Sequence, residues 1–210
     1  MRGKRSSGSV WVDGYGTARV ERVNLRKAKV TRRIRVGVQP WDVQYIAGDV
    51  WVTNNVDGTV ARIDPAKNRV VRMIRTGGRP ANITFALGSV WIGSTEGSKV
   101  FRIDPSTNAV TSVESGGDGP ASVEAAGDAI WIANRNSNTL TRLDARTNRV
   151  VATVPVGGMP GWHAVAADGT IFVPNNTDNT VSRVDPETNS VIQTIWVGAG
   201  PLVIRPAFGD

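Results

Sequence analysis

The 210-residue chain contains no cysteine and one histidine, and the scarcity of these two residue types limits the disulfides and metal sites that it can form. Without cysteine no disulfide can stabilise the fold, and zinc sites built from thiolates or clustered histidines are excluded. No run approaches the roughly 18 apolar residues that a membrane-spanning helix needs. The basic start at residues 1–9 is not followed by an apolar segment, so the sequence predicts no signal peptide.

Acidic residues are scarce at the N-terminal end. Residues 1–35 hold 11 of the 25 Lys and Arg residues but only two acids, Asp13 and Glu21. The basic residues 2–35 suit an anionic membrane surface, a polyanion or an acidic partner, and the alternative is a solvated tail beside one charged sheet surface. Aromatic residues do not alternate with these charges as they do on nucleic-acid stacking platforms, so no specific nucleic-acid recognition is expected.

Internal repetition dominates the rest of the sequence. An aromatic residue flanked by apolar ones recurs every 40 or 41 residues, and an arginine stands eleven residues after each aromatic. A proline leads each unit with the same spacing. Three markers in one register predict a repeat architecture. The aromatic residues are Trp11, Trp51, Trp91, Trp131 and Phe172, and the arginines are Arg22, Arg62, Arg102, Arg142 and Arg183.

Each unit divides into four short β-strands. Tight hairpin turns are indicated by Gly48-Asp49 and Asp168-Gly169, and a second turn by Asp64-Pro65 and its repeats. No segment has a sustained 3.6-residue period, so helices are not expected. Four antiparallel strands per forty residues predict an all-β fold, a β-propeller of about five four-stranded blades. The recurring tryptophans are expected in the core between blades, and the recurring arginines are expected to pair with nearby acids.

The expected domain organisation is a basic tail at residues 1–9 and one propeller domain at residues 10–210. The final residues have the pattern of a first strand that lacks its following tryptophan strand. We therefore expect residues 201–210 to close the propeller by completing the first blade, and the alternative is a fragment of a larger ring. The repeat units span residues 10–39, 40–79, 80–119, 120–159 and 160–200.

The segment Val50-Trp51-Val52-Thr53-Asn54-Asn55, with Ile63-Asp64-Pro65 behind it, resembles the YVTN-type propeller repeat of YncE-like proteins. The first unit departs most, because Ala28 stands where the other units have asparagine. The resemblance implies a seven-bladed ring, of which this chain would be a fragment. It also implies a bacterial, extracytoplasmic protein, periplasmic, secreted or at the cell surface, that works by binding or scaffolding.

The repeat also resembles that of streptogramin B lyases, which open a lactone ring with Mg²⁺. That pattern places a histidine directly after the leading proline in two blades and a glutamate three residues after a tryptophan. Here neither residue type occurs at any matching position. The residues after the prolines are Trp41, Ala81, Ala121, Gly161 and Leu202, and those three after the aromatics are Gly14, Asn54, Ser94, Asn134 and Asn175.

Chain direction places the connections from fourth to first strands and the loops from second to third strands on one face, which we call the loop face. Aromatic, amide and hydroxyl side chains on this face suit a small polar ligand or a protein, although loop asparagines also serve turn geometry. The residues expected to bind are Trp41, Asp42, Asn54, Asn82, Ser94, Asn134, Trp162, His163 and Asn175.

No catalytic residue, metal ligand or cofactor is predicted. His163 lies near the start of a first strand, where a hydrogen-bonding role is favoured over general-base catalysis. The aspartates that recur once per unit are too far apart to share a metal ion. The sequence therefore predicts a non-enzymatic binding scaffold, and the alternative is a degenerate carbon–oxygen lyase of the streptogramin type.

Overall fold

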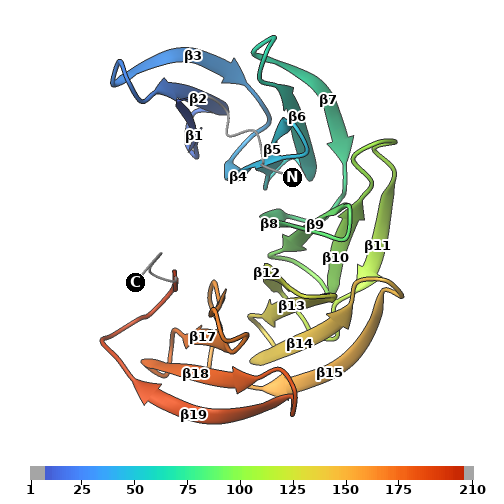
Figure 1. Ribbon diagram of the computed structural model, residues 1–210, viewed down its shortest axis with the longest axis vertical. Coiled ribbons are helices and arrows are strands. Elements are labelled where there is room, and N and C mark those ends of the chain that lie inside the picture. The colour runs from blue at the N-terminus through green and yellow to red at the C-terminus, as the bar shows by residue number, and fades with distance from the viewer. Residues whose placement is uncertain (1–7, 206–210) are drawn as a thin grey trace. The chain divides into compact units, whose positions relative to one another are not determined.

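The computed structural model describes residues 8–205, and every regular element in this range is a β-strand, which confirms the all-β prediction (Figure 1). Most of the predicted tail at residues 1–9 and half of the predicted closing strand lie outside the described residues. No helix able to cross a membrane occurs in the described part. The chain divides into two compact units, Met1–Ala81 and Asn82–Asp210.

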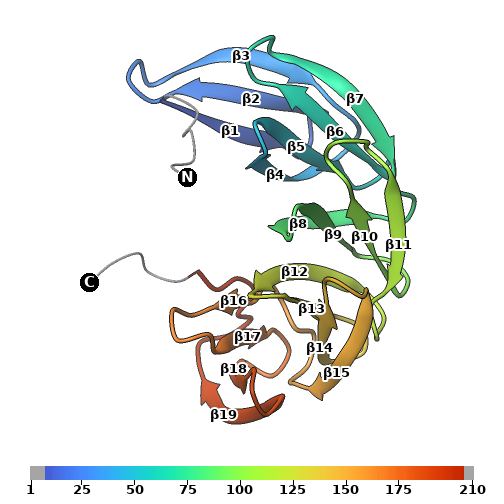
Figure 2. The same cartoon turned by 45° about the vertical axis from the view of Figure 1, so that its right-hand side comes forward.

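Unit 1 contains the first and second sheets, in which neighbouring strands pair antiparallel in chain order (Figure 2). The first sheet has three strands where four were expected, because its β1 corresponds to the second strand of the other sheets. The first sheet comprises β1 (Ser9–Gly14), β2 (Arg19–Asn24) and β3 (Lys29–Arg35), and the second comprises β4 (Pro40–Ile46), β5 (Asp49–Asn54), β6 (Thr59–Asp64) and β7 (Arg69–Arg75).

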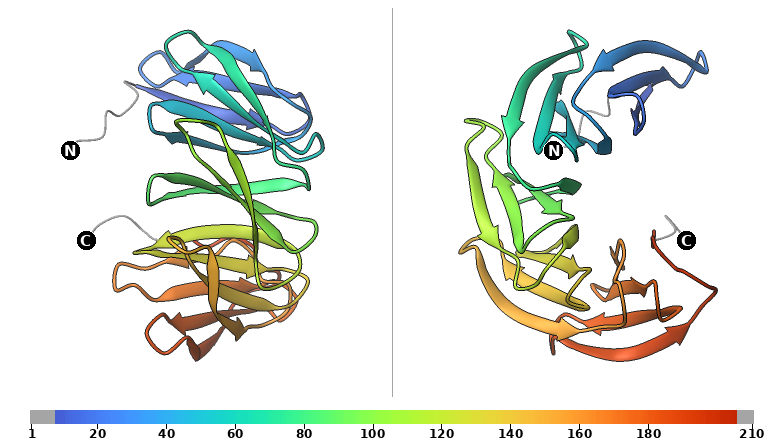
Figure 3. Two further views of the ribbon diagram at one scale, coloured as in Figure 1. Left: turned by 90° about the vertical axis from the view of Figure 1, so that its right-hand side faces the viewer. Right: turned by 180° about the vertical axis from the view of Figure 1, so that it is seen from behind.

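Unit 2 contains the third, fourth and fifth sheets, each with four antiparallel strands in chain order (Figure 3). The third comprises β8 (Pro80–Ala86), β9 (Ser89–Ser94), β10 (Lys99–Ile103) and β11 (Val110–Glu114). The first two residues of β8 belong to unit 1. The fourth comprises β12 (Pro120–Ala126), β13 (Ala129–Asn134), β14 (Thr139–Asp144) and β15 (Arg149–Pro155). The fifth comprises β16 (Ala164–Val165), β17 (Ile171–Asn175), β18 (Thr180–Asp185) and β19 (Ser190–Trp196).

The C-terminal residues run parallel to the start of the fifth sheet. Trp162 N donates to Leu202 O at 2.8 Å, and Ile204 N donates to Trp162 O at 3.0 Å. Residues 202–204 therefore lie beside the segment that leads into β16. Completion of the first sheet by residues 201–210 stays a prediction.

The recurring turns explain the strand spacing. Asp64 Oδ1 accepts hydrogen bonds from Ala66 N at 2.8 Å and Lys67 N at 3.0 Å, which fixes the start of the turn. Asn68 ends it with φ 51°, a left-handed conformation that asparagine tolerates better than most residues. In the first sheet Ala28 occupies the equivalent position with φ 46°, so alanine there adopts an unfavourable backbone conformation.

The sheets within each unit pack face to face. In unit 1 Val20 and Ile34 of the first sheet pack against Val50, Val52 and other residues of the second. In unit 2 the third and fourth sheets enclose Trp91, and the fourth and fifth enclose Trp131. These tryptophans are almost completely buried, which confirms their predicted place in the core.

Two of the five recurring arginines pair with acids as predicted, Arg62 with Asp49 at 2.6 Å and Arg183 with Asp168 at 3.3 Å, and the other three have a different role. Arg102 Nη1 reaches the next sheet, where it donates to Ala145 O at 3.1 Å and Asn148 Oδ1 at 3.0 Å, and its guanidinium lies 5.4 Å from the centre of the Trp91 ring. Arg22 and Arg142 bridge to the next sheet in the same way. Pairing with acids was therefore wrong for these three, because the acceptors are turn carbonyls and amides.

Candidate functional site

Four of the residues predicted to bind a ligand are completely buried at the ends of their strands: Asn54, Ser94, Asn134 and Asn175. Asn54 Oδ1 accepts from Gly37 N at 3.0 Å, and its amide nitrogen donates to Thr59 Oγ1 at 3.1 Å. Asn175 Nδ2 donates to Thr180 Oγ1 and Ser182 Oγ, each at 2.9 Å. The amide nitrogens of the three asparagines and the Asn54 oxygen are therefore committed to hydrogen bonds inside the protein, whereas Oδ1 of Asn134 and Oδ1 of Asn175 are buried without a hydrogen-bond partner.

Glycine makes this close packing possible. A Cβ atom added at Gly117 would lie 2.6 Å from Cγ of Asn134, and one added at Gly157 would lie 2.6 Å from Cγ of Asn175. Real Cβ atoms do not approach other atoms so closely. The asparagine and glycine together fix each connection that enters the following sheet, which is a structural role that a loop sequence alone does not reveal.

His163 is completely buried in unit 2. Its Nδ1 lies 3.1 Å from Ser122 Oγ, while Nε2 makes no hydrogen bond of standard geometry. Burial lowers the pKa of His163 to about 4, although the Trp131 backbone opposes the shift slightly. The ring is therefore neutral at physiological pH, and a buried ring cannot contact a ligand unless the surrounding segment moves.

Asn82 is also buried in unit 2, and its Oδ1 accepts from Val123 N at 2.8 Å. Trp162, directly before His163, is half-buried, and the Arg205 guanidinium lies 6.0 Å from its ring. Unit 2 thus contains six of the predicted binding residues. All but Trp162 are buried.

Unit 1 contains the other three predicted residues, Trp41, Asp42 and Asn54. Trp41 is half-buried and meets the Tyr15 ring edge-on, with ring centres 5.7 Å apart. Asp42 Oδ1 accepts from Val43 N at 2.8 Å, so one carboxylate oxygen is hydrogen-bonded to the backbone of the next residue. Because Trp41 and Asp42 are only half-buried, they keep surface that a ligand could contact.

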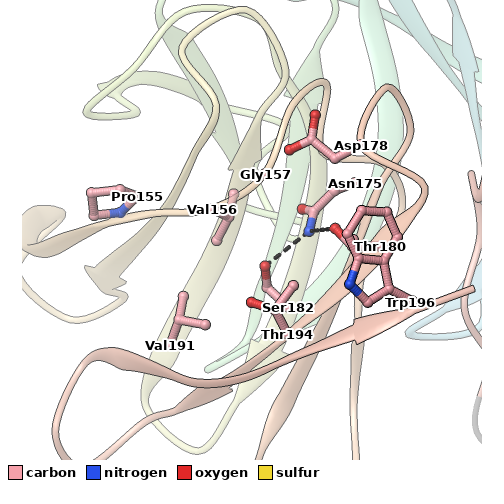
Figure 4. Close-up of a pocket in the computed structure, with 10 residues that line it drawn as sticks. All are labelled: Pro155, Val156, Gly157, Asn175, Asp178, Thr180, Ser182, Val191, Thr194 and Trp196. Atoms are coloured by element: carbon pink, nitrogen blue, oxygen red, sulfur yellow. Dashed lines mark hydrogen bonds between the residues drawn. The ribbon is translucent and has the colours of Figure 1, made fainter.

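A hollow in unit 2 lies on the loop face, at the fifth sheet. It has a volume of about 640 Å³ and is lined by Pro155, Val156, Gly157, Asn175, Asp178, Thr180, Ser182, Val191, Thr194 and Trp196. Figure 4 shows Pro155 and Val156 on one side of this pocket and Trp196 on the other. Of the predicted binding residues, Asn175 alone lines it.

Trp196 is the functional candidate that the sequence prediction missed. It is 79% exposed, the largest exposure among the described large hydrophobic residues. Its cross-strand partner is Thr180, and the residues at the same register in earlier sheets are Arg35, Arg75, Glu114 and Pro155. Aligning the five sheets at this position identifies Trp196 as the one aromatic side chain among them.

The pocket combines an apolar ring with hydroxyl, amide and carboxylate groups. Thr180 and Ser182 lie in its buried part and accept from Asn175, so each retains its own O–H for donation. Asp178 is exposed at the rim, and its Oδ2 accepts from Gly158 N at 2.8 Å. An exposed aromatic face beside several hydroxyl groups suits a polar ligand that also has an apolar face.

The pocket beside Trp196 differs from the equivalent region of the second sheet. There Met73 occupies the position of Thr194, and its sulfur lies 3.5 Å from Asn54 Nδ2. Short side chains also stand at this position in the third and fourth sheets, Ser112 and Thr153, so the position separates the fifth sheet from the second only. Among the described residues, no group of three or more His, Cys, Asp or Glu side chains could hold a metal ion.

No family model and no curated protein matches the chain. Similar solved structures include dihydro-heme d1 dehydrogenase NirN in complex with DHE, at 16% identity and TM-score 0.80 over 96% of this chain, which spans 47% of that one. A catalytically inactive virginiamycin B lyase from Staphylococcus aureus with quinupristin matches at 16% identity and TM-score 0.79, over 92% of this chain and 68% of that one. Hydrazine synthase from Kuenenia stuttgartiensis matches at 13% identity and TM-score 0.66, over 92% of this chain and 85% of that one. The fold is that of a β-propeller. Identities this low show the fold alone.

Proposed function

We propose that the protein is a non-enzymatic β-propeller that binds a small polyhydroxylated ligand, such as a saccharide, in the pocket beside Trp196. The observation that carries this proposal is the 79% exposed Trp196 ring at the rim of a pocket whose buried part presents the Thr180 and Ser182 hydroxyls. A saccharide has both an apolar ring face and hydroxyl groups, so it would use both parts of the pocket.

The dimensions and position of the pocket support this function. Its volume of about 640 Å³ falls within the roughly 300–1,000 Å³ typical of small-molecule sites. Gly157 belongs to a connection from fourth to first strand, and Asp178 to a loop from second to third strand. The pocket therefore lies on the loop face, where the sequence predicted binding.

The pocket's polar groups would orient the ligand. Thr194 and Asp178 are exposed and can exchange hydrogen bonds with hydroxyl groups, while Trp196 would cover an apolar face. The other predicted residues with accessible surface are Trp162 in unit 2 and Trp41 and Asp42 in unit 1, and each unit offers its own surface to a small polar ligand or a protein partner. Membership of the YVTN-type family and an extracytoplasmic location are part of the same proposal.

The alternative function is that of a lyase related to the virginiamycin B lyases. The chain shares their fold, and virginiamycin B lyase has been solved with quinupristin. No specific observation among residues 8–205 favours this function, since His163 is buried and the histidine and glutamate of the lyase pattern do not occur at matching positions.

A glycan array followed by isothermal titration calorimetry tests the proposal. We expect a saccharide to bind the wild type and to lose at least about tenfold in affinity with Trp196→Ala, since stacking and ring burial are removed. Ile192→Ala is a matched control, because Ile192 is exposed on the same strand but does not line the pocket. Absence of saccharide binding, or equal binding by Trp196→Ala, would overturn the proposal. Quinupristin turnover by the wild type would support the lyase alternative instead.

A further inference from the structure

A second, smaller hollow lies in unit 1 and has a different chemistry. It has a volume of about 250 Å³ and is lined by Ser9, Arg22, Asn24, Thr31, Arg32 and Asn68. These side chains comprise two guanidinium groups, two amides and two hydroxyls. Among residues 8–205 no carboxylate lines this hollow, which we call the arginine pocket.

Arg22 is held firmly in the arginine pocket. Its Nε donates to Ser9 Oγ at 3.1 Å, and its Nη1 donates to Pro65 O at 2.8 Å and to Asn68 Oδ1 at 2.9 Å. The guanidinium also lies 5.4 Å from the centre of the Trp11 ring. All three hydrogen-bond acceptors are uncharged, so these bonds position the guanidinium without neutralising it.

Arg32 lies directly across the sheet from Arg22. Like charges at opposed positions destabilise a sheet. In unit 2 the residue opposite the recurring arginine is neutral in every sheet: Thr111, Ala152 and Gln193. The exposed Arg32 therefore adds a second positive charge where the repeat does not require one.

The second sheet carries the same arginine pair but compensates for it. Arg62 lies opposite Arg72, and Arg62 Nε is 2.6 Å from Asp49 Oδ2. At the position of Asp49 the first sheet has Ser9, and at the position of the recurring turn aspartate it has Asn24. The carboxylate that pairs with Arg62 is thus replaced by the Ser9 hydroxyl, and the turn carboxylate by the neutral Asn24 amide.

We propose that the arginine pocket binds a tetrahedral oxyanion, a phosphate or sulfate group. Two guanidinium groups can donate charge-assisted hydrogen bonds to such an anion, and guanidinium groups match phosphate geometry well. The Ser9 and Thr31 hydroxyls and the Asn24 amide can complete its hydrogen bonds. Binding would remove the repulsion between Arg22 and Arg32, which no ion pair with a carboxylate in the described part of the chain compensates. This site lies in unit 1, apart from the pocket beside Trp196 in unit 2.

The test titrates the full chain with inorganic phosphate and inorganic sulfate at constant ionic strength, with chloride as the reference anion, followed by calorimetry and thermal unfolding. Saturable binding and an increase in Tm with phosphate or sulfate, but not with chloride, are expected. Ser9→Asp restores the carboxylate of the second sheet. We expect it to abolish anion binding while raising the Tm of the free protein, so a loss of binding cannot be attributed to unfolding.

Two further variants separate this pocket from general basic charge. Arg32→Thr introduces the residue found opposite Arg102 and should weaken phosphate binding at least about tenfold. Arg72→Thr makes the same change in the compensated second sheet and should leave phosphate binding unchanged. Equal loss with both variants, or unchanged binding by Ser9→Asp, would overturn the proposal.

A last arm distinguishes a free anion from a lipid headgroup. Vesicles containing phosphatidate are incubated with wild type and Ser9→Asp. Retention that inorganic phosphate competes away and that Ser9→Asp abolishes would place a headgroup phosphate in the same pocket. Retention without saturable phosphate binding, unaffected by Ser9→Asp, would mean a general attraction between the basic surface and the membrane, and would overturn the proposal.

Discussion

Nδ1 of His163 and Oγ of Ser122 lie 3.1 Å apart inside unit 2, and they join the segment before β16 to the strand β12 of the preceding sheet. The same burial that holds this pair lowers the pKa of His163 to about 4 from 6.5. One partner of this contact between two sheets, the His163 imidazole, is thus a titratable group, and the free energy of unfolding should depend on pH.

Acidification should destabilise the fold through His163. Between pH 6.5 and about 4 the unfolded chain binds a proton that the folded protein does not. The free energy of unfolding is therefore unaffected by protonation of His163 above pH 6.5. It decreases as the pH falls from 6.5 to about 4, by a total of about 3 kcal/mol. Urea unfolding at several pH values measures it. His163→Asn should flatten the curve in this range, and a wild-type curve that is equally flat would be inconsistent with a depressed pKa.

Replacing Ala28 should stabilise unit 1. Ala28 has φ 46° where the other sheets have asparagine, so Ala28→Asn should raise the free energy of unfolding by about 1 kcal/mol. Thermal unfolding measures the gain. Ala66→Asn serves as the control, because Ala66 is exposed in the equivalent turn of the second sheet without a positive φ. Equal effects of both changes would argue against backbone strain at Ala28.

The bridge from Arg102 to the next sheet should contribute to stability. Arg102→Met keeps an unbranched chain beside Trp91 but removes the bonds to Ala145 O and Asn148 Oδ1 in the next sheet and to Ser89 Oγ in its own sheet. A loss of about 2 kcal/mol is expected, since three acceptors lose a charged donor. Chemical denaturation measures it. Arg146→Met, at an exposed site of the same turn, should change stability by less than about 0.5 kcal/mol. A similarly small effect of Arg102→Met would rule out a stabilising bridge.

The contact between Gly117 and Asn134 should not tolerate a methyl group. Gly117→Ala places Cβ 2.6 Å from Asn134 Cγ, so we expect a loss of about 1–3 kcal/mol from overpacking. Gly198→Ala has no atom within 4 Å of the new Cβ and should be nearly neutral. Differential scanning calorimetry compares the two. If Gly117→Ala unfolds at the wild-type temperature, the connection is not fixed by this contact.

The sheets could be predicted from the sequence because Trp51 and its counterparts recur every 40 or 41 residues, and three of them, Trp51, Trp91 and Trp131, are buried in the core. The sequence also places the start of the repeats at the strand that carries Trp11, and the described part of the first sheet begins with that strand, β1. The direction of the Arg102 side chain could not be predicted. Its acceptors, Ala145 and Asn148, are in another sheet, and nothing in the local sequence links them.

The binding residues were harder to predict than the fold. Asn54 and Asn175 are polar loop-end residues, and the sequence does not show that Gly37 and Gly157 pack against them. Trp196 was missed because it continues an ordinary alternating strand. Its difference from Arg75 and Pro155 becomes meaningful only when the cross-strand register aligns the sheets.

The central claim, that the pocket beside Trp196 binds a saccharide, is tested most directly by nuclear magnetic resonance with a saccharide selected on the array. The account predicts that the Trp196 indole N–H and the backbone amides of Asp178 and Thr194 shift together and saturate with one affinity. Saturable shifts confined to residues elsewhere, with the Trp196 indole signal unmoved, would contradict it.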